Sequence, residues 1–106
     1  MKGDVVVVPF PFSDLTNTKK RPAFVLSDLH GDDVILCQIT SQKVKDKHAI
    51  EISDSDFHKG SLSQISNIRP NKIFTADSNI IEKCVGKIND SKFKEVTDEI
   101  IKIIKK

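Results

Sequence analysis

The chain has 106 residues, of which 38% are hydrophobic and 30% charged, and its formal net charge is +2 at pH 7. This length fits one domain over residues 1–106 and is too short for two independent cores. No apolar run approaches the ~20 residues that a membrane-spanning helix needs, and so small a net charge does not by itself identify a nucleic-acid-binding protein. We therefore expect a small globular protein with no membrane partner.

The first part of the chain predicts β structure. Residues 5–8 are a continuous run of valines, and Pro9 and Pro11 follow it. Because proline cannot donate to a ladder, we expect this strand to stop or bend there, at a sheet edge. The polar segment 13–20 predicts a loop, and 23–26 predicts the second strand. An acidic residue in the first apolar run and the lack of a small-residue cleavage site favour a strand over a signal peptide.

The middle of the chain continues in short strands. Residues 30–33 predict a tight turn that joins strand 23–26 to strand 34–40 in a hairpin. The acidic segment 53–60 predicts a turn. Further strands are expected at 48–52, with one face in solvent, and at 72–75 and 84–88. The apolar spacing at 62–69 allows a helical turn, but the polar residues there and the following Pro70 favour a bulged strand.

In the last segment the apolar residues recur at helical spacing and do not alternate as in a strand. Polar residues at 89–91 can cap a helix, and lysines at its end suit the helix dipole. The apolar residues that recur at helical spacing are Phe93, Val96, Ile100, Ile103 and Ile104. The order predicts a mainly β fold with a C-terminal α-helix that covers one opening of a small barrel or bent sheet.

The cysteines and histidines do not indicate a metal or redox site. Cys37 and Cys84 each lie in an apolar, strand-like run, so we expect two buried thiols, no disulfide and a reducing, cytoplasmic location. There is no CxxC, HExxH or glycine-rich phosphate loop, and we expect neither a metal nor a cofactor. His30, His48 and His58 are scattered in a way more typical of polar loops than of an acid/base pair.

Polar residues stand at two strand ends that the hairpin brings together. Arg21 precedes the strand 23–26, and Thr40 ends the strand that begins after the turn at 30–33. Counting outward from the turn places Arg21 close to Thr40. A guanidinium beside a hydroxyl suits one phosphate group. Each residue alone is more typical of a structural role, Arg21 as a surface cation before a turn and Thr40 as a strand-forming side chain.

Several motifs resemble those of one protein family, the MazF/PemK toxins. Residues 3–12 (GDVVVVPFPF) and 20–27 (KRPAFVLS) resemble the opening of these toxins. Residues 39–42 (ITSQ) look like the motif at the end of the family's third strand, and 66–74 (SNIRPNKIF) resemble its later strand pair. Gly-Lys-Ile at 86–88 before an amphipathic helix matches its ending. The resemblance covers essentially the whole chain in order.

This resemblance implies an SH3-like β-barrel that forms a homodimer and acts as the toxin of a type II toxin–antitoxin system. It implies sequence-selective cleavage of single-stranded RNA without a metal, through attack of the 2′-hydroxyl, giving 2′,3′-cyclic phosphate and 5′-hydroxyl ends. It also implies a cognate antitoxin that occupies the RNA groove, and DNA binding together with that antitoxin.

The family's essential arginine and threonine match Arg21 and Thr40, which are the expected catalytic residues. Arg21 can stabilise the extra negative charge of the phosphorane, and it can relay a proton. Thr40, with Ser41, can hold a non-bridging phosphate oxygen. These roles need only the substrate's own nucleophile, which agrees with the absence of a metal motif.

Four further residues are weaker candidates. Lys20 and Arg69 can contact phosphates, and Gln42 can read a base edge. Asp14 is the candidate general base, although a solvated turn aspartate is more common. The loop 13–20 is shorter and less glycine-rich than in many relatives, which leaves the cleavage sequence open.

Two other functions are compatible with this sequence. One is an SH3-like module that binds RNA or a peptide without cutting, and the other is a gyrase-directed toxin like CcdB. The presence of both Arg21 and Thr40 favours the nuclease over the binding module. The C-terminal Ile-Ile-Lys-Lys at 103–106 lies on a stripe typical of core packing, which argues against the gyrase-directed toxin.

Overall fold

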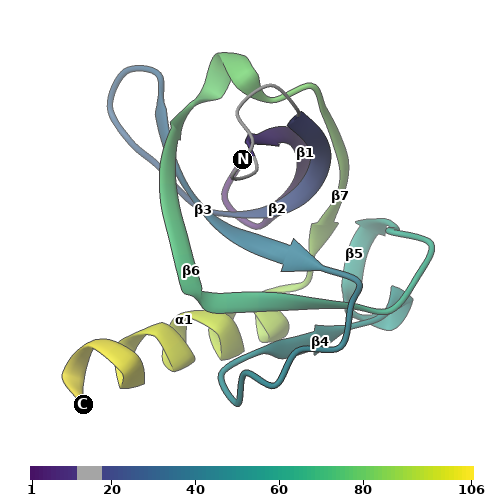
Figure 1. The fold of residues 1–106 in the computed structure, drawn as a ribbon, viewed down its shortest axis with the longest axis vertical. Coiled ribbons are helices and arrows are strands. Elements are labelled where there is room, and N and C mark those ends of the chain that lie inside the picture. Colours follow the sequence, from purple (N-terminus) through teal and green to yellow (C-terminus); the bar gives the residue numbers. More distant parts are fainter. Residues whose placement is uncertain (12–17) are drawn as a thin grey trace.

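The structure is a computed structural model that describes residues 1–11 and 18–106 (Figure 1). The candidate base Asp14 and most of the expected first loop lie outside the described residues. No helix in the described part of the chain is long and apolar enough to cross a membrane.

Seven strands and one long helix make up the described fold. They are β1 (Asp4–Pro11), β2 (Thr18–Asp28), β3 (Asp33–Thr40), β4 (Ile50–Ile52), β5 (Phe57–Gly60), β6 (Ser66–Asp77), β7 (Lys83–Ile88) and α1 (Asp90–Lys105). Short 3₁₀ helices at Asp54–Asp56 and Ser78–Ile80 precede β5 and β7. The strands form one antiparallel sheet in the order β4-β6-β3-β2-β1-β7-β5. Figure 1 shows this sheet curled into a partial barrel, with α1 across its lower opening. The expected fold class, a small curled sheet with a C-terminal helix, is confirmed.

The curl buries both faces of the central strands. Val5 belongs to a core cluster that packs against α1, whereas its neighbours Val6 and Val8 belong to a second cluster on the opposite face of the sheet. Because successive side chains of a strand alternate between faces, a strand buried on both sides requires a continuous apolar run. This is the physical reason for the valine run near the N-terminus.

Helix α1 completes the first cluster. Val96 is fully buried, and Phe93 and Ile100 pack against the same cluster while half-buried. The side chain of Asn89 caps the helix by accepting the backbone N–H of its first turn at 2.8 Å, as expected. Ile104 is 73% exposed, so the apolar stripe extends beyond the part of the helix that the sheet covers.

The two prolines do not end β1, which contradicts the sequence-based expectation. The carbonyl of Val7 accepts the N–H of Glu82 at 2.9 Å, so this face of the β1 backbone points toward β7. Pro9 and Pro11 lie two and four residues further on and share that direction, but β7 pairs with β1 only as far as Val7. Their missing N–H groups therefore interrupt no ladder, and β1 continues to pair with β2.

Strand β2 begins earlier than expected. It starts at Thr18, so Lys19 and Lys20 lie in the strand opposite Phe10 and Pro9, and not in a loop. The pairing with β1 overrides the polar composition of this stretch, because a strand edge tolerates polar side chains that point to solvent.

Strand β6 replaces two of the expected strands. Arg69 lies opposite Gln38 and Ile73 opposite Cys37, so residues 70–72 form a bulge without a counterpart in β3. The strand bends there, as Figure 1 shows, and the buried Pro70 occupies the bulge. The expected strand start at 62 is wrong, because β6 begins at Ser66.

The two thiols differ in exposure. Both are free, and Cys37 is fully buried as expected, with burial raising the pKa of its thiol to about 12. The expected burial of Cys84 is wrong: it is exposed, and its Sγ donates to the carbonyl of Gly86 at 3.3 Å. Cys84 lies in β7, near the edge of the sheet, where only β5 pairs beyond it.

Strand β5, which was expected to be a turn, pairs antiparallel with β7, and two glycines lie opposite each other in this pairing. Gly60 has φ +78° and lies opposite Gly86. A Cβ at Gly60 would stand 2.1 Å from the carbonyl oxygen of Val85. The approach of the two strands therefore requires glycine at this position.

Gly60→Ala should destabilise the fold more than Gly31→Ala does. Both positions have positive φ, and alanine should cost about 1–2 kcal/mol at each for that reason. A Cβ at Gly31 meets nothing within 4 Å, whereas the clash at Gly60 should add about 1–3 kcal/mol. Urea unfolding of both variants measures the difference, and equal losses of the free energy of unfolding would contradict the close approach of the β5 and β7 backbones at Gly60.

Candidate functional site

A cavity of about 270 Å³ opens where the adjacent ends of β2 and β3 meet. The antiparallel register pairs Ala23 with Gln38, and its continuation toward the strand ends places Arg21 beside Thr40. The described residues that line the cavity are Val7, Lys20, Arg21, Pro22, Ile39, Thr40, Ser41, Leu62, Gln64 and Ser66. The two expected catalytic residues therefore share one cavity.

The cavity combines an apolar wall with basic and hydroxyl groups. Val7 and Ile39 supply part of the wall, while Arg21 and Lys20 supply positive charge. Ser66 is the buried polar residue of the described chain, with 2% of its surface exposed. Such a site can bind one phosphate by its charge and the adjoining ribose by its apolar wall.

The hydroxyl of Thr40 is oriented by the backbone that follows it. Its Oγ1 accepts the N–H of Gln42 at 3.2 Å. Because a hydroxyl can accept and donate at once, this contact leaves its proton available for an anion in the cavity. The side chain of Gln42 is exposed and does not line the cavity.

The ammonium of Lys20 has an acidic partner that sequence reasoning missed. Its Nζ lies 2.9 Å from Oε1 of Glu82, which precedes β7, and its side chain is 70% exposed. An ion pair as exposed as this contributes little to stability and can exchange readily with another anion. Lys20 therefore stays able to contact a phosphate at the cavity edge.

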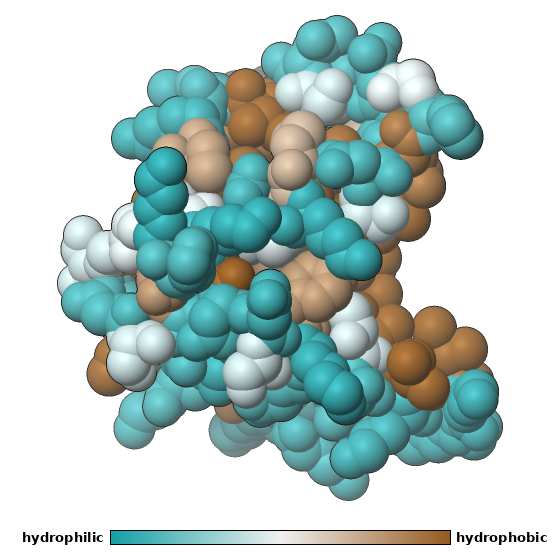
Figure 2. All heavy atoms as spheres, turned by 180° about the vertical axis from the view of Figure 1, so that it is seen from behind, coloured by the Kyte–Doolittle hydropathy of each residue, from teal (hydrophilic) through white to brown (hydrophobic). Residues whose placement is uncertain are grey.

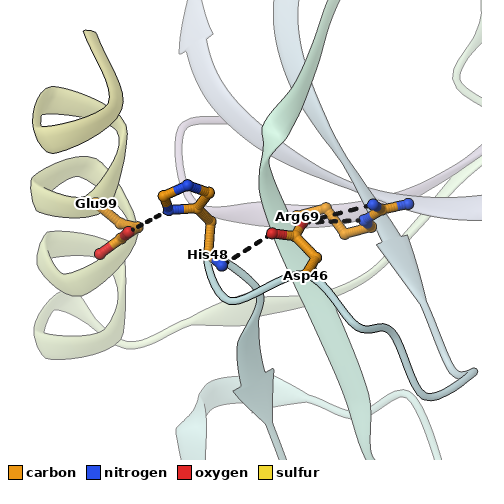
Figure 3. Close-up of polar contacts among 4 residues, drawn as sticks. All are labelled: Asp46, His48, Arg69 and Glu99. Carbon is orange, nitrogen blue, oxygen red and sulfur yellow. Dashed lines mark hydrogen bonds and ion pairs between the residues drawn. The ribbon is translucent and has the colours of Figure 1, made fainter. Parts of the chain in front are cut away.

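Arg69 lies outside the cavity lining and binds a carboxylate. Its Nε and Nη2 donate to Oδ2 of Asp46 at 3.4 and 3.5 Å, and the Asp46 side chain is 8% exposed (Figure 3). Burial raises the pKa of Asp46, but the N–H of His48 and the guanidinium of Arg69 outweigh it and hold that pKa below its ordinary value of 3.8.

The same carboxylate anchors the segment that follows Thr40. Oδ1 of Asp46 accepts the N–H of His48 at 2.9 Å, and the His48 ring Nδ1 lies 2.7 Å from Oε2 of Glu99 on α1. Figure 3 shows the chain of contacts from the helix through His48 and Asp46 to Arg69 on β6. Residues 41–49 are thereby tied to β6 and to α1.

The expected site residues separate into two groups. Lys20, Arg21, Thr40 and Ser41 come together in the cavity, whereas Gln42 and Arg69 do not line it. Among residues 1–11 and 18–106, no group of three or more histidine, cysteine, aspartate or glutamate side chains could hold a metal ion.

The sequence matches the family described as "PemK-like, MazF-like toxin of type II toxin-antitoxin system" over residues 1–104. The chain belongs to this toxin family. The family resemblance read from its motifs is thus confirmed. Among curated proteins, none matches the sequence.

Solved structures share the fold of this toxin-family chain at low sequence identity. A mycobacterial endoribonuclease in complex with its cognate antitoxin is 14% identical, with a TM-score of 0.76, 99% of this chain covered and 94% of that chain. A chain of a MazE–MazF complex from Deinococcus radiodurans is 17% identical (TM-score 0.76, 97% of this chain and 93% of that chain covered). The Mycobacterium tuberculosis toxin MazF-mt6 is 16% identical (TM-score 0.73, 96% of both chains).

Asp46→Asn should destabilise this toxin-family fold in a pH-dependent way. A carboxyl whose pKa is lowered by folding stabilises the native state fully above its unfolded pKa, and that contribution is lost as pH falls through the folded pKa. The variant should lose about 1–3 kcal/mol at pH 7. The difference in free energy of unfolding between wild type and variant should become smaller below pH 3.8.

Urea unfolding at a series of pH values from 7 downward measures this difference. Asp98→Asn serves as the control, because Asp98 is exposed on α1 and pairs with Lys94 one turn away. A difference in free energy of unfolding that stays constant across the pH series would contradict the role of the Asp46 carboxylate.

Proposed function

We propose that this chain is an endoribonuclease toxin that cuts single-stranded RNA without a metal. The observation that carries the proposal is the shared cavity of Arg21 and Thr40, in a chain of the PemK-like, MazF-like family. The names of the fold neighbours, which include endoribonucleases, support the same reaction class. Messenger RNA in the cytoplasm is the proposed substrate.

The proposed reaction uses the nucleophile of the RNA itself. The 2′-hydroxyl oxygen bonds to phosphorus, the bond from phosphorus to the 5′-oxygen breaks, and a 2′,3′-cyclic phosphate and a 5′-hydroxyl result. Arg21 stabilises the charge of the phosphorane and supplies the proton to the leaving 5′-oxygen. The Thr40 hydroxyl donates to a non-bridging oxygen. Asp14 stays the candidate acceptor of the 2′-hydroxyl proton.

The residues around this pair have supporting roles in the proposal. Lys20 exchanges Glu82 for a neighbouring phosphate of the RNA, and Ser41 adds a second hydroxyl beside Thr40. Gln42 and Arg69 are given no direct phosphate or base contact, because they lie outside the cavity lining. Arg69 acts through Asp46 on the segment 41–49.

We further propose a cognate antitoxin that blocks the cavity. Fold neighbours from mycobacteria and from Deinococcus radiodurans occur in complexes with antitoxins. An acidic or extended segment of the antitoxin can occupy the same basic cavity as RNA. Together with its antitoxin, the chain would bind DNA.

Incubation with a long single-stranded RNA in EDTA tests the nuclease. The wild type should give discrete cuts with 5′-hydroxyl ends. Arg21→Ala and Thr40→Val should each lower the rate about 10²-fold or more, because each removes a donor to the developing charge. Thr40→Ser, which keeps the hydroxyl, should retain most of the rate. Mapping of the cut ends by primer extension is the measurement.

Lys94→Ala is the matched control for loss of a positive charge, because Lys94 pairs with Asp98 on α1 and lines none of the described cavities. A folded wild type that does not cut would favour the RNA- or peptide-binding module or the gyrase-directed toxin. Cutting that survives in both Arg21→Ala and Thr40→Val would place the reaction elsewhere.

We propose a homodimer as the assembly. Large hydrophobic side chains stay exposed on α1, at Ile101 (49%) and Ile104 (73%). Figure 2 shows hydrophobic side chains gathered at the lower right, over the C-terminal part of this helix. A chain of 106 residues buries only a modest core, so a two-fold contact would add stability.

Size-exclusion chromatography with light scattering should give twice the chain mass of 11.9 kDa at micromolar concentration. Ile104→Glu should shift the protein toward the monomer, because it puts a charge into the apolar patch. A wild-type monomer at that concentration would refute the dimer.

A further inference from the structure

A second cavity adjoins the proposed cleavage cavity and differs from it in charge. It measures about 310 Å³ and lies between the 3₁₀ helix that follows β4 and the segment that enters β6. Its described lining residues are Ser53, Asp54, Ser55, Ser63, Gln64 and Ile65. Gln64 also lines the cavity of Arg21 and Thr40, so the two cavities share this residue.

The acidic group of this second cavity is held in place. Oδ1 of Asp54 accepts the hydroxyl of Ser61 at 2.6 Å, and the same hydroxyl accepts the N–H of Ser63 at 2.9 Å. Ser63 has φ +71°, a left-handed conformation that is costly for a residue with a side chain. The hydrogen bonds to Ser61 therefore fix the Asp54 carboxylate relative to the wall at 63–65.

No cation pairs with Asp54 among the residues that the structure describes, which are 1–11 and 18–106. An unneutralised carboxylate repels phosphate, so this cavity is not suited to the RNA backbone. The Asp54 carboxylate accepts hydrogen bonds from N–H groups instead. Ile65, which is 60% exposed, offers an apolar surface for a flat base beside it.

We propose that the second cavity receives a base next to the scissile phosphate and that Asp54 selects that base by its exocyclic amino group. Cytosine, adenine and guanine carry such a group, and uracil does not. Uracil offers only its N3–H, which lies between two carbonyl oxygens that the carboxylate repels. Asp54 therefore disfavours uracil at one position next to the cut. This inference rests on the proposed RNA-directed function and adds a specificity residue to it.

Selection from a random RNA pool that cannot be cut tests the inference. In a fully 2′-fluoro pool the nucleophile is missing, so binding is measured apart from cleavage. RNA retained by the wild type should be depleted of uracil about fivefold or more at one position. Asp54→Asn should return uracil to near its input frequency there, because the amide can also donate to the carbonyl oxygens of uracil.

Asp98→Asn is the control, because it makes the same change in charge on α1, away from both cavities. It should keep the wild-type depletion. Asparagine at 54 can still accept from Ser61, so the variant should fold, and circular dichroism checks this. Depletion that persists in Asp54→Asn, or a wild type that shows no depletion, overturns the inference.

The selection and the cleavage assay together distinguish a failure of this inference from a failure of the proposed nuclease function. Selective binding that depends on Asp54, without cleavage of ordinary RNA, would refute only the nuclease. Cleavage with the same base preference in wild type and Asp54→Asn would refute only the role of Asp54. A wild type that neither binds nor cuts RNA refutes both.

Discussion

The antiparallel pairing of β1, β2 and β3 is the constraint on which the rest of the structure depends. It buries both faces of the three strands, so the sheet curls, and it fixes the register between β2 and β3. The same register brings the ends of the two strands together, and with them Arg21 and Thr40. The stability of the core and the geometry of the candidate site therefore have one origin, and a shift of one residue in the pairing would lose both.

A partly buried polar network supports the segment that begins at Thr40. Asp46 bonds to Arg69 on β6 and to the backbone of His48, whose ring meets Glu99 on α1. These contacts join three elements that are far apart in sequence. If the segment after the strand were loosely held, the Thr40 hydroxyl would be poorly positioned. The network restrains this segment and so helps to fix the geometry of the candidate site. It also connects the site to the helix whose far end exposes its isoleucines.

The net charge of +2 does not show how unevenly positive and negative side chains are distributed between the two cavities. Lys20 and Arg21 make one cavity basic, while Asp54 makes the adjoining cavity acidic. Glu82 partly neutralises the first of these at its edge. In the proposed function, the basic cavity would bind the charged backbone of a single-stranded RNA, and the acidic cavity would accept hydrogen bonds from the amino group of a neutral base.

The sequence by itself determined the fold class, the turn at 30–33, the C-terminal helix with its cap, and the closeness of Arg21 and Thr40, because these follow from local periodicity and from counting across one hairpin. Only the tertiary structure decided that β1 runs through its prolines, that β6 is one bent strand, and that Arg69 faces Asp46 and not the cavity. Each of those outcomes depends on a neighbour distant in the chain: the end of the β7 ladder, the register with β3, and a carboxylate in another segment. Such pairings leave no periodic signal in the sequence, because burial and hydrogen bonding between remote residues are set only when the sheet has curled.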